Sequence, residues 1–372
     1  MQANVVVIHA DEEPIKGIDN PTPNQIYKNV RVSLKERELG MLGPDDIRVQ
    51  IAYVGICGTD VHLTTNHPET GYISCSAPLS IPEEGRVIGH EGVGKVIAVG
   101  NNMSHLALGS YVALESIIIC HRCTACRRGK FNQCLNAKLL GLEQDGILGT
   151  IVDVPGSLAH DLTLFIRSES DLMAAANIEP AAVAYVGCEN AQLVPGEKVA
   201  IFGAGPIGLF VAMLCRQVFG SSEIHMIEPN EFRRNFARPW ADHVHDVESF
   251  FYRSIDGIDV VFEASAILQN VTRVIRRINA NGRVILLGRK GYPFNIQDVD
   301  HMITNEITIK GSRGHLGGAF EKVMRLHQSN RINLLDVVTQ SVHGLKEASD
   351  MLMHSERIEQ ENCKVIVNVS SY

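Results

Sequence analysis

The chain has 372 residues, of which 45% are hydrophobic and 20% charged, and its formal net charge is −8. This length and composition predict a globular protein of two domains and exclude an intrinsically disordered chain. The negative charge, with Lys and Arg scattered along the sequence, disfavours a nucleic-acid partner, because phosphate binding needs a basic face.

The sequence gives no signal for export or membrane insertion. Its first residues lack the basic segment of a secretion signal, and the most apolar helix candidate, residues 207–215, is far too short to span a bilayer. The nine cysteines form no even-paired framework outside one cluster, as is typical of a reducing compartment. We therefore expect a cytoplasmic protein with no membrane partner.

The first third of the chain predicts short strands separated by turns. Alternating apolar and β-branched residues with Gly and Pro between them give this pattern at residues 5–9, 46–55, 92–99 and 111–114. Residues 66–86 contain Pro, Ser and Glu and predict a long loop. This part of the sequence therefore indicates a β-rich domain.

Four clustered cysteines follow, at Cys120, Cys123, Cys126 and Cys134, with the spacing Cys-x2-Cys-x2-Cys-x7-Cys. Four thiolates this close in sequence predict a closed tetrahedral sulfur site, which zinc prefers when its role is structural. An iron–sulfur cluster accepts the same ligands, and the spacing alone leaves that alternative open. Inert or disulfide-bonded cysteines are a third, disfavoured interpretation. A closed site performs no chemistry, so an activity must lie elsewhere.

From about residue 171 strands and helices alternate. They are expected, in chain order, at residues 199–202, 206–219, 223–228, 259–262, 266–278 and 283–287. Alternation at this spacing predicts a parallel sheet with crossover helices. A helix near residues 318–327 and a strand at residues 364–369 complete the pattern.

A glycine-rich motif follows the first of these strands and opens the next helix. It consists of Gly203, Gly205, Pro206, Ile207 and Gly208. In this context the first glycine makes a tight turn, the second lets a pyrophosphate approach the backbone, and the third lets helix and strand pack closely. The pyrophosphate then lies at the positive end of the helix. The motif therefore predicts a dinucleotide site.

An acidic residue, Glu228, ends the strand that follows this helix. Its carboxylate can accept hydrogen bonds from the adenosine ribose and would repel a 2′-phosphate, which favours NAD over NADP. Arg233 and Arg234 lie close enough in sequence to soften that preference.

A second metal site is indicated by three residues in separate segments. Cys57 lies in Gly-Ile-Cys-Gly-Thr-Asp, His90 in Gly-His-Glu-Gly, and Glu179 in Ile-Glu-Pro. A thiolate, an imidazole and a carboxylate form the kind of zinc shell that keeps one position open for substrate. Each residue alone has an ordinary structural explanation, but together with the cysteine cluster and the dinucleotide motif they favour a catalytic zinc.

With these motifs the chain resembles the zinc-dependent medium-chain alcohol dehydrogenases, closest to the polyol (sorbitol) and threonine dehydrogenase branch. The segments around Cys57 and His90 resemble the catalytic-zinc segments of the family, and Glu179-Pro180 matches the Glu-Pro of the polyol branch. The resemblance covers nearly the full length and implies an α/β fold of two domains. These are a GroES-like β-rich catalytic domain at residues 1–170, with a structural zinc lobe at 120–134 and completed by 315–372, and a Rossmann NAD-binding domain with a doubly wound parallel sheet at 171–314.

The resemblance also implies roles for single residues and two zinc ions per chain, one catalytic and one structural. Either Glu91 or Glu179 completes the catalytic zinc shell, directly or through water. Thr59 hydrogen-bonds the substrate oxygen or its relay water, and His62 carries the proton to solvent. Arg313 holds substrate or cofactor.

The implied reaction is hydride transfer between a secondary alcohol and NAD. A polyol, cyclitol or amino-polyol is the favoured substrate class, and a threonine-like amino alcohol is the second. A redox-neutral epimerase or lyase using bound NAD is an alternative on the same fold. A non-enzymatic protein on this scaffold is disfavoured because the catalytic ligands are present. The family also implies a homodimer or homotetramer, whereas departures at Gly149, Trp240 and residues 66–86 leave the individual substrate open.

Overall fold

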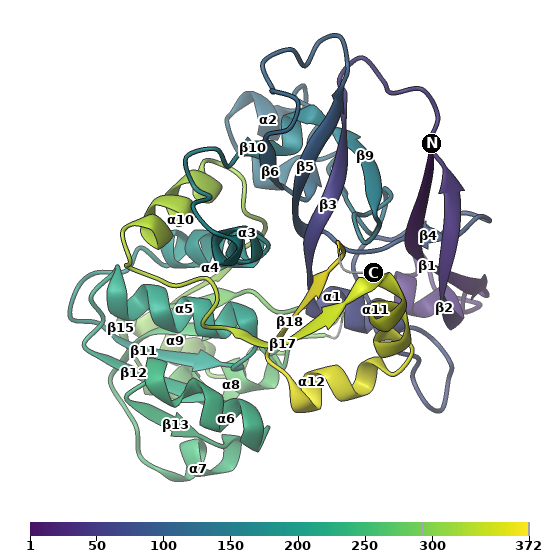
Figure 1. Cartoon of the computed structure of the whole chain (residues 1–372). Helices are drawn as coiled ribbons and strands as arrows, with labels where there is room; N and C mark the ends of the chain where they lie inside the picture. Colours follow the sequence, from purple (N-terminus) through teal and green to yellow (C-terminus); the bar gives the residue numbers. More distant parts are fainter. Residues whose placement is uncertain (290, 292, 371–372) are drawn as a thin grey trace. The chain divides into compact units, whose positions relative to one another are not determined.

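The chain divides into two units, each with its own set of contacts, in a computed structural model that describes residues 1–289, 291 and 293–370. The first unit combines Met1–Glu179 with Leu334–Tyr372, and the second is Pro180–Asn333. The domain boundaries expected from the sequence, after residues 170 and 314, stay a prediction. Figure 1 shows the elements of both units.

The first unit is built mainly from antiparallel strands. A seven-stranded sheet has the order β10-β6-β5-β3-β18-β17, with β9 paired to β3 off this path. These strands are β3 (Asp46–Ile56), β5 (Glu91–Val99), β6 (Tyr111–Leu114), β9 (Ile151–Pro155), β10 (Ala159–Asp161), β17 (Val338–His343) and β18 (Lys364–Asn368). The C-terminal β18 thus lies beside β3, so strands from the first and last sixty residues pair within one sheet (Figure 1).

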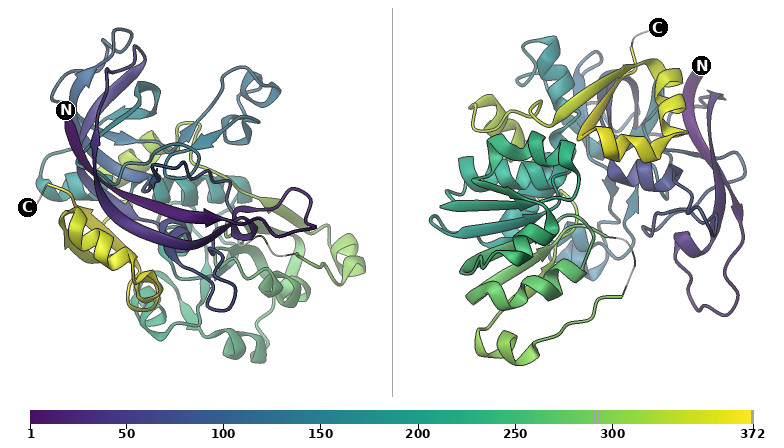
Figure 2. Two further views of the ribbon diagram at one scale, coloured as in Figure 1. Left: turned by 90° about the vertical axis from the view of Figure 1, so that its right-hand side faces the viewer. Right: turned by 90° about the horizontal axis from the view of Figure 1, so that it is seen from below.

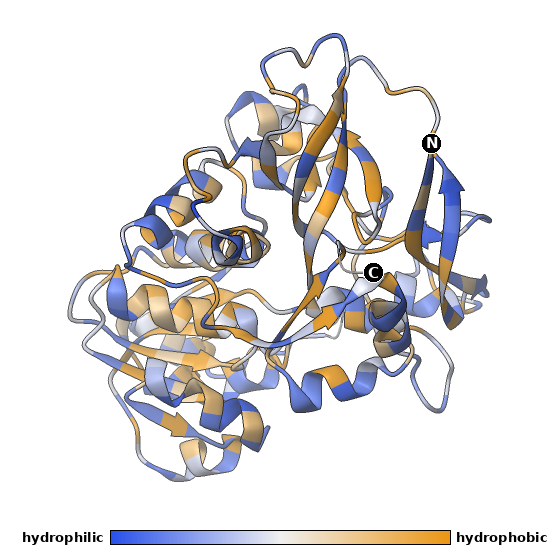
Figure 3. Ribbon diagram, in the orientation of Figure 1, coloured by the Kyte–Doolittle hydropathy of each residue, from blue (hydrophilic) through white to orange (hydrophobic). Residues whose placement is uncertain are grey.

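A long hairpin packs with this unit. It consists of β1 (Gln2–Glu12) and β2 (Tyr27–Glu38), and the short β4 (Arg86–Val87) pairs with β1. Strands β3 and β5 are largely hydrophobic because both of their faces are buried, whereas β2 is polar along its exposed side (Figure 3). The helices of the unit are short: α1 (Gly58–Thr64), α2 (Thr124–Arg127), α3 (Glu169–Ala175), α11 (Gly344–Leu352) and α12 (Ile358–Glu361). Helix α4 (Ile178–Ala191) begins in this unit and continues into the second.

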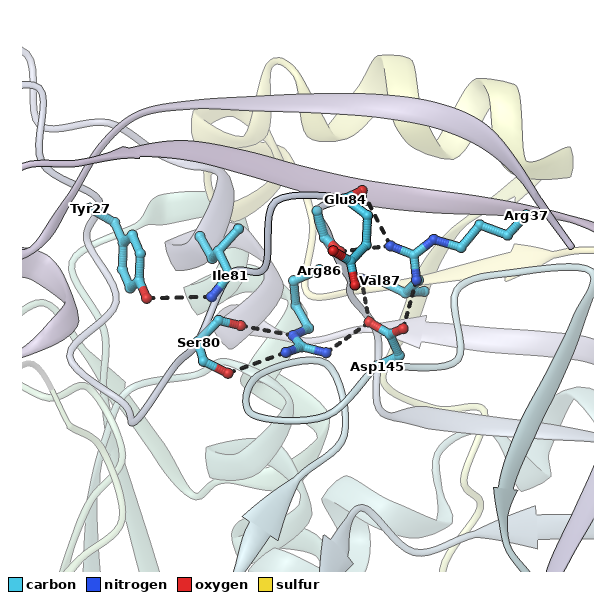
Figure 4. A network of polar contacts seen from close by, with 9 residues as sticks. Tyr27, Arg37, Ser80, Ile81, Glu84, Arg86, Val87 and Asp145 are labelled. Carbon is cyan, nitrogen blue, oxygen red and sulfur yellow. Dashed lines mark hydrogen bonds and ion pairs between the residues drawn. The ribbon is translucent and has the colours of Figure 1, made fainter. Parts of the chain in front are cut away.

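Residues 66–86 form the expected long loop, and a polar network holds its last part. Arg86 donates to the Ser80 carbonyl oxygen at 2.9 Å and to Asp145 Oδ1 at 2.8 Å, and Arg37 donates to Asp145 Oδ2 at 2.6 Å (Figure 4). The Arg86 side chain is only 10% exposed, so its charge depends on this carboxylate. Asp145 therefore fixes the end of the loop just before the segment that carries His90.

The second unit contains a six-stranded, fully parallel sheet. Its order is β13-β12-β11-β14-β15-β16, in which the first strand lies in the centre and the chain reverses direction there, as in doubly wound dinucleotide folds. The strands are β11 (Lys198–Phe202), β12 (Glu223–Ile227), β13 (His243–His245), β14 (Ile258–Glu263), β15 (Ile278–Leu286) and β16 (Thr308–Gly311). This confirms the predicted parallel sheet.

Helices cover both faces of that sheet (Figure 2). The described helices of this unit that follow α4 are α5 (Pro206–Gln217), α6 (Glu231–Ala237), α7 (Val247–Tyr252), α8 (Gln269–Val274), α9 (Val299–Thr304) and α10 (Ala319–Gln328). The helix expected at residues 266–278 is shorter than predicted, because Ala266 has a left-handed φ of 61° and the chain tightens into a 3₁₀ turn after Val274. Within the described ranges, no helix is both long and apolar enough to cross a bilayer.

Candidate active site

The four clustered cysteines lie together in a small lobe bounded by β7 (Ile117–Ile118) and β8 (Lys138–Leu139). Cys134 Sγ is 3.6 Å from Cys120 Sγ and 4.0 Å from Cys123 Sγ. Zn–S bonds of about 2.3 Å place the sulfur atoms of a tetrahedral site about 3.8 Å apart, so the lobe fits a closed zinc site. The four cysteines of the lobe are not disulfide-bonded, which argues against the disulfide interpretation.

The thiols of this lobe have opposite titration behaviour. Hydrogen bonds from the Asn136 side chain and from backbone N–H groups lower the pKa of Cys120 to about 5. Burial and the neighbouring thiols raise the pKa of Cys126 to about 12. The four sulfurs therefore cannot all ionise at neutral pH without a cation among them, and a divalent ion would supply that charge.

Replacing Cys123 by serine is expected to remove one zinc per chain and to loosen the lobe. Structural zinc contributes about 10–16 kcal/mol of binding free energy in small zinc domains, so a lobe without it has little to hold it folded. Tryptic cleavage after Arg127 and Arg128 should become faster in the variant. Cys215→Ala, which changes a buried cysteine of α5, is the control and should keep its zinc. An unchanged zinc content in Cys123→Ser would contradict the metal assignment.

A second group of potential ligands lies in the first unit where β3 ends and β5 begins. Cys57 follows β3 and precedes α1, whereas His90 and Glu91 stand at the start of β5. Their ligand atoms all lie within 4.8 Å of one another. β3 and β5 are paired neighbours, with Gly55 opposite Glu91, so the sheet register brings these segments together. The structure thus places two of the predicted ligand segments side by side.

A buried carboxylate, Asp60, joins these two segments. Its Oδ2 accepts a hydrogen bond from the backbone N–H of Cys57 at 2.9 Å, and its Oδ1 accepts one from that of Gly89 at 3.1 Å. Asp60 is fully buried, and its Oδ1 lies 3.9 Å from His90 Nδ1. His90 Nδ1 is itself buried and has no hydrogen-bond partner among the described residues. Asp60 thus positions both ligand segments and faces the imidazole from behind.

The two candidate acidic ligands have different partners. Glu91 forms a fully buried ion pair with Lys364 of β18, whose ammonium also donates to the Ile56 carbonyl oxygen at 3.0 Å. Glu179, in the first turn of α4, accepts a hydrogen bond from Ser116 Oγ at 2.9 Å. Glu179 lies outside the group of Cys57, His90 and Glu91 whose ligand atoms converge within 4.8 Å. Either carboxylate as the third ligand therefore stays a prediction.

Buried acidic groups outnumber basic groups at this site, so a bound cation would balance their charge. Four acidic groups, Cys57, Asp60, Glu91 and Glu179, lie here with two basic groups, the His90 imidazole and the Lys364 ammonium. Burial, then the charge of Glu91, raises the pKa of Cys57, and the same two causes raise that of Glu179 to about 7. A divalent metal reverses these shifts, because it stabilises the thiolate and the carboxylates. The donor set of sulfur, nitrogen and oxygen is one that zinc accepts.

The two residues expected to handle the proton both lie on α1. Thr59 is in its first turn, two residues after Cys57, and is partly exposed. His62 is in its last turn, and its Nε2 lies 3.6 Å from Glu359 Oε1 of α12. The His62 side chain is 26% exposed, so it has access to solvent. One helix thus runs from the Cys57 segment towards the surface, as a proton path requires.

The glycine-rich turn of the second unit lies between β11 and α5, as predicted. Gly203 has a φ of 98°, in the left-handed region that favours glycine. A side chain at Gly208 would place its Cβ 1.9 Å from the Gly203 carbonyl oxygen, so the helix can pack here only without one. At Gly205 a Cβ would approach one atom of the described residues, Nη1 of Arg233 at 3.8 Å, which leaves the backbone open to a ligand. Pro206 is the first residue of α5 and Ile207 the second.

The carboxylate of Glu228 is hydrogen-bonded to the backbone of this turn. One of its carboxylate oxygens accepts a hydrogen bond from Ala204 N at 2.8 Å and the other from Asn230 N at 2.9 Å. Each oxygen keeps a second lone pair, so the group retains capacity to bind ribose hydroxyls. Arg233 projects over the same turn, whereas Arg313 lies exposed just beyond β16. The structure thus groups Glu228 and Arg233 with the glycines and does not give Arg313 a partner there.

Sequence reasoning missed three side chains that hold the metal residues in place: Asp60, Ser116 and Lys364. Asp60 had a local signal, because an acid three residues after the N-cap residue, here Cys57, resembles the pattern of a capping box. Ser116 and Lys364 had none, since each acts on a residue far away in the sequence.

One surface hollow of the first unit, of about 630 Å³, is lined by Tyr53, Tyr111, Arg167 and Glu169 among others. None of the predicted metal ligands lines this hollow, so we do not assign it as the substrate site.

Two family models match the chain. Residues 43–163 match the alcohol dehydrogenase GroES-like domain, and residues 206–329 match the zinc-binding dehydrogenase domain. The first match contains Cys57, His90 and the cysteine lobe, and the second begins at Pro206 and contains Gly208 and Glu228.

Curated proteins are similar over more than four fifths of the chain, and solved structures over nearly all of it. The L-threonine 3-dehydrogenase of Pyrococcus furiosus is 29% identical over 84% of this chain and 88% of its own length. A probable D-xylulose reductase A of Aspergillus clavatus is 30% identical, over 83% of this chain and 86% of its own length. The structure of L-idonate 5-dehydrogenase from Escherichia coli shares 22% identity and superposes with a TM-score of 0.78, covering 99% of each chain, which is a similarity of fold.

Proposed function

Because the chain belongs to the zinc-dependent medium-chain alcohol dehydrogenase family, we propose that it transfers hydride between a secondary alcohol of a polyol, cyclitol or amino-polyol and NAD. The observation that carries this proposal is the convergence of Cys57, His90 and Glu91 within 4.8 Å. The polyol class is supported by the similarity to the Aspergillus D-xylulose reductase, and a threonine-like amino alcohol by that to the Pyrococcus L-threonine dehydrogenase.

The residues of the first unit would bind and prepare the alcohol. Cys57, His90 and one of the carboxylates, Glu91 or Glu179, would hold the catalytic zinc. When bound, this metal lowers the pKa of a hydroxyl group beside it, and NAD accepts the hydride. The hydroxyl oxygen of Thr59 would accept a hydrogen bond from the substrate hydroxyl and so orient the substrate oxygen. His62 would pass the proton to solvent.

The residues of the second unit would bind the cofactor. Backbone N–H groups at the start of α5 would donate hydrogen bonds to the pyrophosphate. Gly203, Gly205 and Gly208 leave the space in which the pyrophosphate can approach this backbone. Glu228 would accept hydrogen bonds from the adenosine ribose, and Arg233 would lie beside the phosphates. We propose Arg313 as a further contact to cofactor or substrate. Two zinc ions per chain, a cytoplasmic location and assembly into a dimer or tetramer complete the proposal.

The test is to measure reduced nicotinamide formed from NAD across a panel of polyols, cyclitols, aminocyclitols and threonine, with zinc counted on the same sample. Turnover of a polyol or cyclitol is the expected result. Preferential turnover of threonine would instead assign the amino-alcohol class. If bound cofactor stays unchanged while substrate is converted, the enzyme is a redox-neutral epimerase or lyase and the dehydrogenase proposal fails.

Replacing Glu228 by glutamine is expected to shift cofactor preference towards NADP. The amide keeps an oxygen for one backbone N–H but removes the negative charge that would face a 2′-phosphate. We expect the ratio of kcat/KM for NAD to that for NADP to fall about tenfold, a change of about 1.4 kcal/mol. Glu231→Gln, on the exposed first turn of α6, is the control and should leave the ratio unchanged. Equal ratios in all three proteins would contradict the role of Glu228.

A further inference from the structure

Three histidines and a glutamate, none of them assigned to the sites described above, lie at one edge of the parallel sheet in the second unit. β12 and β13 are neighbouring parallel strands at this edge (Figure 1). His225 stands opposite His243 in their register. Side chains two apart on a strand share a face, so Glu223 projects with His225 and His245 with His243. The sequence Glu-Ile-His on one strand and His-Val-His on the other therefore places all four on one face.

Three of these side chains aim their polar atoms at a common point. Glu223 Oε1 lies 2.9 Å from His225 Nε2 and 3.2 Å from His243 Nε2, and the three atoms all lie within 4.8 Å of one another. Nitrogen and oxygen ligands at about 2.05 Å from a tetrahedral zinc are about 3.3 Å apart. The spacing of the three side chains is therefore close to that of a zinc shell, and small rotations would open it to an ion.

The groups behind these three atoms orient them as metal ligands are usually oriented. His225 Nδ1 forms a hydrogen bond with His245 Nε2 at 3.1 Å, which fixes the orientation of the His225 ring. Glu223 Oε2 lies 3.0 Å from the ammonium of Lys198 on β11, so Oε1 is the oxygen that faces the two imidazoles. Histidine and carboxylate ligands of metals are generally held by a second hydrogen bond of this kind.

The cluster is buried at one end and open at the other. His225 is 3% exposed and packs near Phe250 of α7, with ring centroids 6.4 Å apart. The side chains of His243 and Glu223 are 50% and 32% exposed. An ion can therefore enter from solvent without disturbing the core, and water can fill the position that the protein leaves open. Imidazole with carboxylate suits zinc among the divalent metals.

From this geometry we propose that Glu223, His225 and His243 form a third zinc site, a three-ligand surface site that is separate from the cysteine lobe and from the Cys57 site. In the metal-free protein Nε2 of both imidazoles lies within hydrogen-bonding distance of Glu223 Oε1. Zinc would bind the Nε2 lone pair of each neutral ring, so each ring would carry its proton on Nδ1 and no proton would be released. The bound ion connects β13, the outermost strand of the sheet, to β12. Its binding therefore stabilises this edge and requires no participation in hydride transfer.

The site is tested by counting zinc. We would equilibrate the full-length protein and the variants His243→Ala and Glu223→Gln with Zn²⁺ alone. All three proteins experience the same free Zn²⁺ concentration, in the micromolar range, and zinc per chain is measured by elemental analysis. Each variant is expected to bind one zinc fewer than the unchanged protein. Isothermal titration with Zn²⁺ should show the same loss of one binding event. Because the readout is a difference in metal content, it does not depend on catalysis or on the occupancy of the other two sites.

A matched variant removes a histidine elsewhere. His354→Ala, an exposed histidine of the first unit outside the cluster, should keep the zinc content of the unchanged protein. The exposure of His243 means that its replacement should leave the fold intact, which circular dichroism checks. Equal zinc content in the unchanged protein, His243→Ala and Glu223→Gln overturns the site. A loss in His354→Ala equal to that in His243→Ala also overturns it, because binding would then be unspecific.

Discussion

Replacing Cys57 by alanine should lower kcat/KM for the alcohol substrate by about a thousandfold or more and remove one zinc per chain. A metal in such a site contributes several kcal/mol to transition-state stabilisation, and each 1.36 kcal/mol is a factor of ten in rate. Cys57 is the sulfur of the converging trio, and its backbone N–H is already held by Asp60 at 2.9 Å. The alanine variant should therefore keep the local backbone while losing a ligand. Steady-state kinetics and elemental analysis on the same preparation measure both effects.

The matched control for this variant is Cys188→Ala. Cys188 is fully buried in α4, so the same atoms are removed from a cysteine that we assign to the core. It should keep its zinc and retain activity within a few-fold, with a stability loss of about 1 kcal/mol from the small cavity. If Cys188→Ala lost the zinc and Cys57→Ala kept it, our choice of ligand would be wrong.

Local sequence patterns predicted much of the fold. The strand, glycine-rich turn and helix at residues 199–219 were predicted nearly at their observed limits, because each depends on neighbouring residues: an apolar run, Gly203 in a left-handed conformation, and Pro206 at the first helical position. β6 was predicted at its exact limits for the same reason. The helix expected from residue 266 failed at its start, since no local signal indicated that Ala266 adopts a positive φ.

The partners of the candidate ligands could not be predicted in this way. Glu91 is separated from Lys364 by 273 positions, and they meet only because β18 pairs with β3. Ser116 and Glu179 are 63 positions apart. The sequence motifs therefore indicated which side chains could bind metal, whereas the structure shows which charges and hydrogen bonds surround them. This also applies to the histidine cluster, which requires the register between β12 and β13.

Replacing Lys364 by methionine should destabilise the first unit by about 3–5 kcal/mol, because it leaves the buried carboxylate of Glu91 without its counter-charge. Lys364 is 1% exposed and Glu91 is 1% exposed, so water cannot replace the lost ammonium. Methionine has a similar length and fills most of the same space, which limits the cavity contribution. The loss is measured as the change in the free energy of unfolding in urea, with zinc content held equal between the proteins.

The same substitution at an exposed ion pair provides the comparison. Lys28 Nζ lies 3.2 Å from Glu13 Oε2, but the two side chains are 26% and 57% exposed. Lys28→Met should therefore cost about 1 kcal/mol or less, since exposed pairs contribute little. Adding Glu91→Gln to Lys364→Met should recover part of the lost stability, because the uncompensated charge is removed. If Lys364→Met and Lys28→Met were equally stable, the Glu91 carboxylate would have another counter-charge in the folded protein, and our account of this pair would be wrong.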